Sequence, residues 1–366
     1  MTLNREKVFR TLTTLDTFVD RALKLKSKGP SLSGFHFTRD LLRAAASNTY
    51  LETVGKRADS IHLAIKKVPS SGVYWEYSKA VRIIGKRFNL SEQDVVLALD
   101  HTAEDFYGDV QGSWIHGWTG EEGVTGKFKF LTCALVSSDI PEKIPLFSIP
   151  VQVGYNLAKN LIFCLSVVRS MVRSIKLVLF NRSFYSKELI MALTDSGYPY
   201  LIFVPANKMV AAELKQMAEG ERKTVHYEFE LNKDKTVLKG ETTLAFLKKV
   251  IDPTNGKVFD WSFATNQERI NLDYIVPTYK GRWRIETGFR VQDEARIKSK
   301  SKEIKVRFFF FIYEQLLQLL WAVLYKDEVS FKEFLLELSE TSGERLEKAE
   351  RKAMRASPQA SGICGL

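Results

Sequence analysis

The chain has 366 residues, of which 45% are hydrophobic, and a net charge of +11 at pH 7. Its length is enough for two or three domains, and its apolar fraction is ordinary for a globular protein with a core. The three cysteines are far apart, which excludes a disulfide framework and a zinc site of the usual spacing and fits a reducing cytosol: Cys133, Cys164 and Cys364. The positive charge favours a polyanionic partner, most simply nucleic acid, although a basic protein with no such partner has the same composition.

Residues 1–90 are predicted to be helical. The N-terminus has no apolar segment of the signal-peptide type, so we expect a cytoplasmic protein. Apolar residues at steps of three and four predict a first helix that ends at Pro30: Val8, Leu12, Leu15, Val19 and Ala22. Further helices are expected from about Thr38 and across residues 74–88. The many cations of this region indicate either a solvated helical surface or, as we slightly favour, a small DNA-binding domain.

From Asp94 the pattern changes to short apolar runs that are typical of strands. Residues 95–99 predict a buried central strand that ends at Asp100 and is followed by a polar turn over 101–108. The next expected elements are strands near 113–118 and over 127–137, a helix over 155–173, a strand over 175–180 that ends at Asn181, a helix capped by Ser186, and a strand over 200–204. The order strand, helix, strand implies parallel pairing through a right-handed crossover.

Residues 206–256 are predicted to be a β-rich insertion, because apolar and polar residues alternate over 225–231 and a partner strand follows from Thr236. A strand over 258–265 and two helices are expected to follow, and the tail beyond Gly343 is expected to fray. The apolar run 308–325 is long enough to span a membrane, but polar residues interrupt it at Glu314, Gln315 and Gln318. We therefore favour a buried core helix over a membrane span.

One stretch places an unusual set of side chains on a single helical face, since its members follow at steps of three, four, four and three: Tyr279, Arg282, Glu286, Arg290 and Asp293. A helix that brings an acid to a metal and cations to phosphates needs such a face. With Asp100 and Asn181 at strand ends, Glu286 could complete a site for two divalent metals that carry out in-line phosphoryl transfer. The alternative is that an acid at a strand end merely caps the next helix.

These residues resemble those of a known family. The chain is similar over roughly residues 94–325 to DDE-class insertion-sequence transposases, whose catalytic domain is ribonuclease-H-like. In one branch the third acid lies in a Tyr-x2-Arg-x3-Glu-x6-Lys signature, and Tyr279, Arg282 and Glu286 match it at the required spacing. The strand that ends in Asp100 matches the first motif, and the strand followed by Asn181-Arg182 matches the second.

Two positions depart from the family pattern. The second acid is replaced by Asn181, whose amide oxygen can bind a metal but brings no negative charge. We therefore expect metals to bind more weakly and strand cleavage to be largely abolished. The signature's last lysine is replaced by Asp293, and Lys298 is a nearby but off-register cation.

The resemblance implies an α/β fold with a ribonuclease-H-like mixed sheet, flanking helices, a β-rich insertion and an N-terminal helical domain. The implied domains are a DNA-binding domain (1–90), a catalytic domain (91–205 and 257–326), the insertion (206–256) and a C-terminal helix with a frayed tail (327–366). The implied catalytic and metal-binding residues are Asp100, Asn181 and Glu286, with two Mg²⁺ or Mn²⁺ ions. The implied DNA-binding residues are Tyr279, Arg282, Arg290, Lys298 and Arg182.

The implied function is DNA transposition: binding of transposon ends, followed by metal-dependent strand cleavage and transfer, with activity in doubt at Asn181. The implied partners are double-stranded DNA from the terminal repeats and the target, and a second copy in a homodimer on DNA, with no membrane. A prokaryotic cytoplasm, with association with the nucleoid, is the implied location. Two alternatives remain: a catalytically inactive DNA-binding derivative, which Asn181 favours, and a metal-dependent nuclease. Trp283 could stack on a displaced base, but we expect it in the core.

Overall fold

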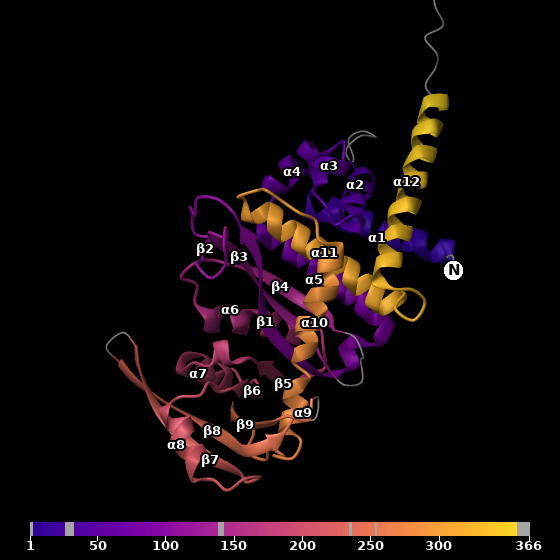
Figure 1. Ribbon diagram of the computed structural model, residues 1–366. Coiled ribbons are helices and arrows are strands. Elements are labelled where there is room, and N and C mark those ends of the chain that lie inside the picture. The colour runs from indigo at the N-terminus through magenta and orange to yellow at the C-terminus, as the bar shows by residue number, and fades with distance from the viewer. Residues whose placement is uncertain (1–2, 26–32, 138–142, 234–235, 253–254, 357–366) are drawn as a thin grey trace, which may run out of the picture. The chain divides into compact units, whose positions relative to one another are not determined.

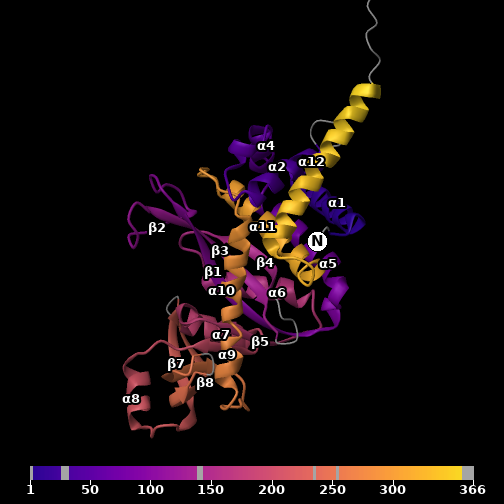
Figure 2. The ribbon, with the colours of Figure 1, turned by 45° about the vertical axis from the view of Figure 1, so that its right-hand side comes forward.

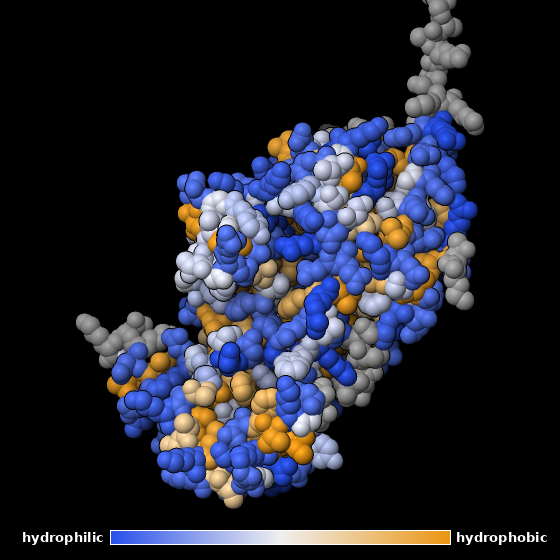
Figure 3. Space-filling view, in the orientation of Figure 1, coloured by the Kyte–Doolittle hydropathy of each residue, from blue (hydrophilic) through white to orange (hydrophobic). Residues whose placement is uncertain are grey.

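The computed structural model describes residues 3–25, 33–137, 143–233, 236–252 and 255–356. The chain divides into two compact units, residues Met1–Ala80 with Val291–Leu366 and residues Val81–Arg290. The first contains helices and the second contains the β-sheet (Figure 1). In Figure 3, hydrophilic residues cover most of the face that is shown, as expected when apolar side chains form the cores.

The first unit is a set of helices. They are α1 (Arg5–Ala22), α2 (Gly34–Ala46), α3 (Leu51–Val54), α4 (Ala58–Lys66), the first part of α5 (Ser70–Gly85), α11 (Ile304–Leu324) and α12 (Phe331–Ala356). Among the described residues α11 is the one helix long and apolar enough to cross a membrane, and 83% of its apolar window is buried. Its Glu314 carboxylate accepts a hydrogen bond from the backbone N–H of Ile297 (2.8 Å). This burial favours the predicted core helix.

The first unit also corrects three predictions. The helices α3 and α4 were not foreseen. The tail was expected to fray beyond Gly343, but α12 continues to Ala356. The helix is held there by tertiary contacts, because Leu346 is buried and Arg345 pairs with Asp16 of α1 (2.5 Å). The predicted fraying over residues 357–366 lies outside the described residues. Helix α1 ends at Ala22, so the prediction that it ends at Pro30, itself outside the described residues, is wrong.

The second unit is built on a nine-stranded mixed sheet with the order β2-β3-β1-β5-β6-β9-β8-β7, in which β4 also pairs with β3. The strands are β1 (Asp94–Phe106), β2 (Ile115–Gly117), β3 (Gly126–Leu135), β4 (Ile144–Val151), β5 (Ser174–Phe180), β6 (Tyr200–Phe203), β7 (Arg222–Lys233), β8 (Thr236–Ile251) and β9 (Val258–Thr265). The pairs β1–β5 and β5–β6 are parallel, as the strand, helix, strand order predicts, and the other pairs are antiparallel.

The helices of this unit are α6 (Leu157–Arg169), α7 (Lys187–Asp195), α8 (Lys208–Gln216), α9 (Ile275–Lys280) and α10 (Trp283–Gln292), the last of which crosses the boundary between the units. The helix α7 begins as predicted, because the Ser186 hydroxyl accepts a hydrogen bond from the backbone N–H of Leu189 (3.2 Å). Cys133 and Cys164 are buried free thiols, as expected of packing residues.

Two strands differ from the predictions. The polar turn expected over 101–108 is wrong for residues 101–106, because β1 continues to pair with β3 as far as Phe106 opposite Gly126. The strand β4, which contains Pro145 and Pro150, was not predicted. Proline is tolerated here because, among the described residues, β4 pairs with β3 alone.

The insertion forms the long β7–β8 hairpin, which packs against α7, and it also contains the helix α8 beside the hairpin (Figure 2). Gly240 of β8 lies directly under the Phe229 ring of β7. A Cβ atom at this position would lie 2.7 Å from ring atoms of Phe229 and 2.9 Å from Met191 Cγ. A larger residue would therefore push the hairpin away from α7.

Candidate active site

Asp100 and Asn181 lie side by side because their strands are parallel neighbours. The last residue pair of β1 and β5 is Leu99 opposite Phe180. The residues that follow this pair, Asp100 and Asn181, therefore lie next to each other at the same end of the two strands. The Asn181 amide Nδ2 donates a hydrogen bond to Asp100 Oδ1 (2.9 Å). Asn181 Oδ1 accepts hydrogen bonds from the backbone N–H (2.9 Å) and hydroxyl (2.5 Å) of Ser183. The nitrogen and the oxygen of the Asn181 amide thus each have a hydrogen-bond partner in the structure.

Arg282 and Glu286 lie in residues 279–293, which were predicted to form one helix. The structure has two helices instead, because α9 ends at Lys280 and α10 begins at Trp283, with Gly281 and Arg282 in a turn between them. The predicted single face over residues 279–293 is therefore interrupted. Both helices are anchored in the core of the unit, α9 through Tyr279 and α10 through Ile285.

The Arg282 guanidinium joins the two acids. Its Nη1 donates to Asp100 Oδ2 (2.9 Å), and its Nη2 donates to Glu286 Oε1 (2.7 Å). Arg282 is 5% exposed and Asp100 is 7% exposed, so this ion pair is buried, whereas Glu286 is exposed. Burial raises the pKa of Asp100 to about 6, although Arg282 and the backbone N–H of His101 oppose the rise.

These residues do not fit a site for two divalent metals as they are arranged. The described residues contain no group of three or more His, Cys, Asp or Glu side chains that could hold a metal ion. The oxygen of Asn181 is turned to Ser183, and the cation between Asp100 and Glu286 is Arg282. A pair of metal ions at this place would require Arg282 to withdraw and the Asn181 amide to turn.

The other predicted DNA-binding residues lie in different settings. Arg182 and Arg290 are exposed. Tyr279 is 4% exposed and packs on Phe263 with ring centroids 5.0 Å apart, so any contact with DNA is limited to the atoms that line the adjacent cavity. Lys298 belongs to the other unit, formed by residues 1–80 and 291–366.

That cavity has a volume of about 480 Å³ and reaches from Asn181 and Arg182 to aromatic side chains that include Trp261 and Trp283. Trp283 is 44% exposed, so the prediction that it lies in the core is wrong. Its ring centroid lies 3.4 Å from Lys280 Nζ, and Lys280 in turn pairs with the buried Asp252 (2.5 Å). The sequence carries no signal for the Lys280–Asp252 pair, because Asp252 follows the long hairpin and the two residues meet through tertiary packing.

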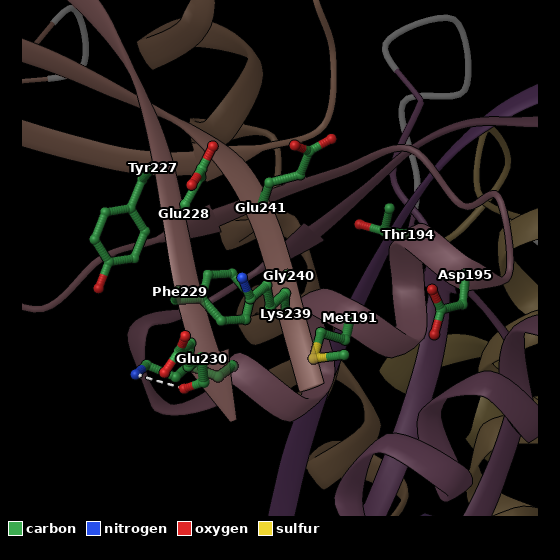
Figure 4. Close-up of a pocket in the computed structure, with 11 residues that line it drawn as sticks. Met191, Thr194, Asp195, Tyr227, Glu228, Phe229, Glu230, Lys239, Gly240 and Glu241 are labelled. Atoms are coloured by element: carbon green, nitrogen blue, oxygen red, sulfur yellow. Dashed lines mark hydrogen bonds between the residues drawn. The ribbon is translucent and has the colours of Figure 1, made fainter. Parts of the chain in front are cut away.

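A larger pocket of about 790 Å³ lies between α7 and the β7–β8 hairpin (Figure 4). Its wall includes Tyr227, Phe229 and Gly240 from the hairpin, and Lys187 of α7 donates a hydrogen bond to the Glu230 carbonyl (3.1 Å). None of the predicted catalytic residues lines it. Size alone therefore does not identify the site.

His101 follows Asp100 and is held in the neutral form. Its ring stacks on Phe184 (centroids 5.0 Å apart), and its Nε2 lies 2.9 Å from the Tyr155 hydroxyl. Burial, with a smaller contribution from Lys129, lowers the pKa of His101 from 6.5 to about 4. The folded state therefore resists protonation at this ring.

The protonation of His101 should make the free energy of unfolding depend on pH. A lowered histidine pKa contributes stability that is present above pH 6.5 and is lost as the pH falls toward 4. On acidification from pH 7 to pH 4 the unmodified protein should lose up to about 3 kcal/mol more unfolding free energy than His101→Gln. Urea unfolding at several pH values measures this difference. Parallel stability curves for the two proteins would contradict the prediction.

Comparison with known proteins gives one domain match and one similar fold. Residues 163–321 match the family of the transposase DDE domain. No curated protein matches the chain. Among solved structures, the cryo-EM structure of a piggyBac transposase synaptic complex with hairpin DNA is similar, with a TM-score of 0.54 and 14% sequence identity over 96% of this chain and 84% of that chain. The structural similarity confirms the ribonuclease-H-like fold, and residues 163–321 of that fold match the transposase DDE domain.

Proposed function

We propose that this protein is a DDE-class transposase that binds the double-stranded DNA of transposon ends, and that strand cleavage and transfer at its site are impaired by Asn181. One observation carries the proposal. At the position of the family's second acid stands an amide that donates a hydrogen bond to the first acid, Asp100. An amide nitrogen beside a carboxylate stabilises that carboxylate, but it supplies no charge for a metal ion.

DNA binding is the part of the activity that these residues retain. Transposase DDE domains generally use divalent metals, and two Mg²⁺ or Mn²⁺ ions are what the family resemblance implies. Here Arg282 pairs with both Asp100 and Glu286 and offsets one of their two negative charges, which reduces the repulsion between this acidic site and a phosphate backbone. The exposed Arg182 and Arg290 add cations that can contact phosphates. The proposed partners are transposon-end and target DNA, with a homodimer as the bound form.

A metal-dependent nuclease without strand transfer is the second candidate. It requires that Asp100 and Glu286 alone hold enough metal for hydrolysis. The present arrangement of the two acids around Arg282 does not favour it. We further propose that the transposase is a homodimer and that it associates with the nucleoid in a prokaryotic cytoplasm.

The test is a nicking assay on labelled terminal-repeat DNA with Mg²⁺ or Mn²⁺. The unmodified chain should retain the DNA in a gel-shift assay without cutting it, and Asn181→Asp should cut. Nicking by the unmodified chain that is lost in Glu286→Gln would overturn the proposed impairment. Failure of the unmodified chain to retain any DNA would overturn the proposed function.

A further inference from the structure

We infer that the first unit carries a second DNA-binding surface, a lysine strip formed by Lys298, Lys300 and Lys302, which binds successive phosphates of one DNA strand. The inference rests on the proposed DNA-binding function, but it concerns residues outside the DDE motifs. It assigns to the strip a contact with the DNA backbone that does not depend on base sequence.

The sequence of the segment repeats a cation at every second position. Arg296, Lys298, Lys300 and Lys302 alternate with Ile297, Ser299 and Ser301. In an extended chain, alternate side chains lie on the same side, and such residues are about 6.6 Å apart. This spacing suits contacts to neighbouring phosphates along a nucleic-acid strand.

The structure shows the exposure that this alternation requires. The three lysines of the strip are exposed, whereas Ile297 is 3% exposed. The segment is fixed to its own unit by backbone contacts: Lys298 N–H donates to the Thr49 carbonyl (3.0 Å), and Lys298 forms a parallel bridge with Tyr50. The lysine side chains therefore extend from an anchored backbone.

The two serines between the lysines hold the local backbone. The Ser299 hydroxyl accepts a hydrogen bond from the N–H of Ser301 (3.1 Å), and the Ser301 hydroxyl accepts one from the N–H of Glu303 (3.1 Å). Arg307 donates to the Ser301 carbonyl (2.8 Å). This order reduces the conformational entropy that the segment would lose on binding DNA.

The charges of the strip are not compensated within the described residues. None of the three lysines forms an ion pair there, although Glu303 follows the strip directly. Lys300 Nζ lies 5.2 Å from the Tyr50 ring centroid, which places an aromatic ring but no anion beside it. Three neighbouring cations repel one another unless a polyanion binds, and lysine acts on phosphate as a point charge.

The test measures DNA affinity at several salt concentrations. Lys298, Lys300 and Lys302 are replaced together by glutamine, and the matched control replaces Lys208, Lys215 and Lys239, three exposed lysines of the other unit. Both variants lose three charges. The probe is a 20-base-pair duplex without transposon sequence, next to one with the transposon end.

On either duplex the strip variant should lower the slope of log affinity against log salt concentration by up to about 2.7, which is three phosphates at about 0.9 each. The control should change it by less than about 1. A strip variant with an unchanged slope, or a control that loses as much, would overturn the inference while leaving the proposed function intact. If the unmodified chain binds neither duplex, both fail. Thermal melting checks that each variant is folded.

Discussion

Asn181→Asp is expected to raise metal-dependent nicking of transposon-end DNA by roughly a hundredfold or more, the size of effect that one charge-stabilising group has in an active site. The new carboxylate would stand beside Asp100, at the place where the amide now donates a hydrogen bond of 2.9 Å. Two adjacent carboxylates near Glu286 offer a divalent metal three anionic ligands, and they outweigh the single charge of Arg282.

Metal binding gives this prediction a readout that does not depend on cleavage. Without metal, the variant should be less stable than the unmodified protein, because two like charges lie side by side. With Mn²⁺ at about one hundred times its dissociation constant, the variant should gain about 2.7 kcal/mol, and the unmodified protein should gain much less. Asn181→Asp combined with Glu286→Gln is the matched control, since it restores the same charge count without the third acid. Equal melting shifts in the variant and the unmodified protein would contradict the expected effect.

The sequence predicts the pairing of Asp100 with Asn181 for a simple physical reason. Each follows a short apolar run typical of a buried strand, and parallel neighbours bring the residues after such runs together. The helix cap at Ser186 and the parallel β5–β6 pair were predictable on the same local grounds. Hydrophobic periodicity and capping are local signals, so these parts of the fold could be read from the sequence.

The rest depends on tertiary contacts that have no local signal. The helical period predicts one helix over residues 279–293, but the structure turns at Gly281 and Arg282. The Arg282–Glu286 pair follows the helical spacing of four, but no spacing rule encodes the contact of Arg282 with Asp100 on β1. Trp283, expected in the core, is 44% exposed, and Lys280 lies over its ring. The roles of the site residues in catalysis remain predictions.

Arg282→Leu is expected to lower the unfolding free energy by about 3 kcal/mol at pH 7.5, the usual cost of removing one partner from a buried ion pair. Arg282 is 5% exposed and donates to Asp100, which is 7% exposed, so the substitution leaves a carboxylate buried without its cation. Arg290→Leu, at an exposed position of the same unit, is the matched control and should change stability little.

The pH dependence decides whether the lost charge pair is the cause. Asp100 already has a pKa near 6, and without Arg282 that pKa rises further, so the carboxyl takes up a proton instead of remaining charged. A raised carboxyl pKa contributes stability at low pH that is lost as the pH rises through the folded-state pKa. Arg282→Leu should therefore differ from the unmodified protein much less at pH 4.5 than at pH 7.5. Arg282→Lys should recover part of the loss, because one ammonium replaces a fork that reaches both Asp100 and Glu286. An equal loss of unfolding free energy at both pH values would mean that Arg282 stabilises the protein by packing and not by its charge. It would contradict the claim that the Arg282 cation stabilises the buried Asp100 carboxylate.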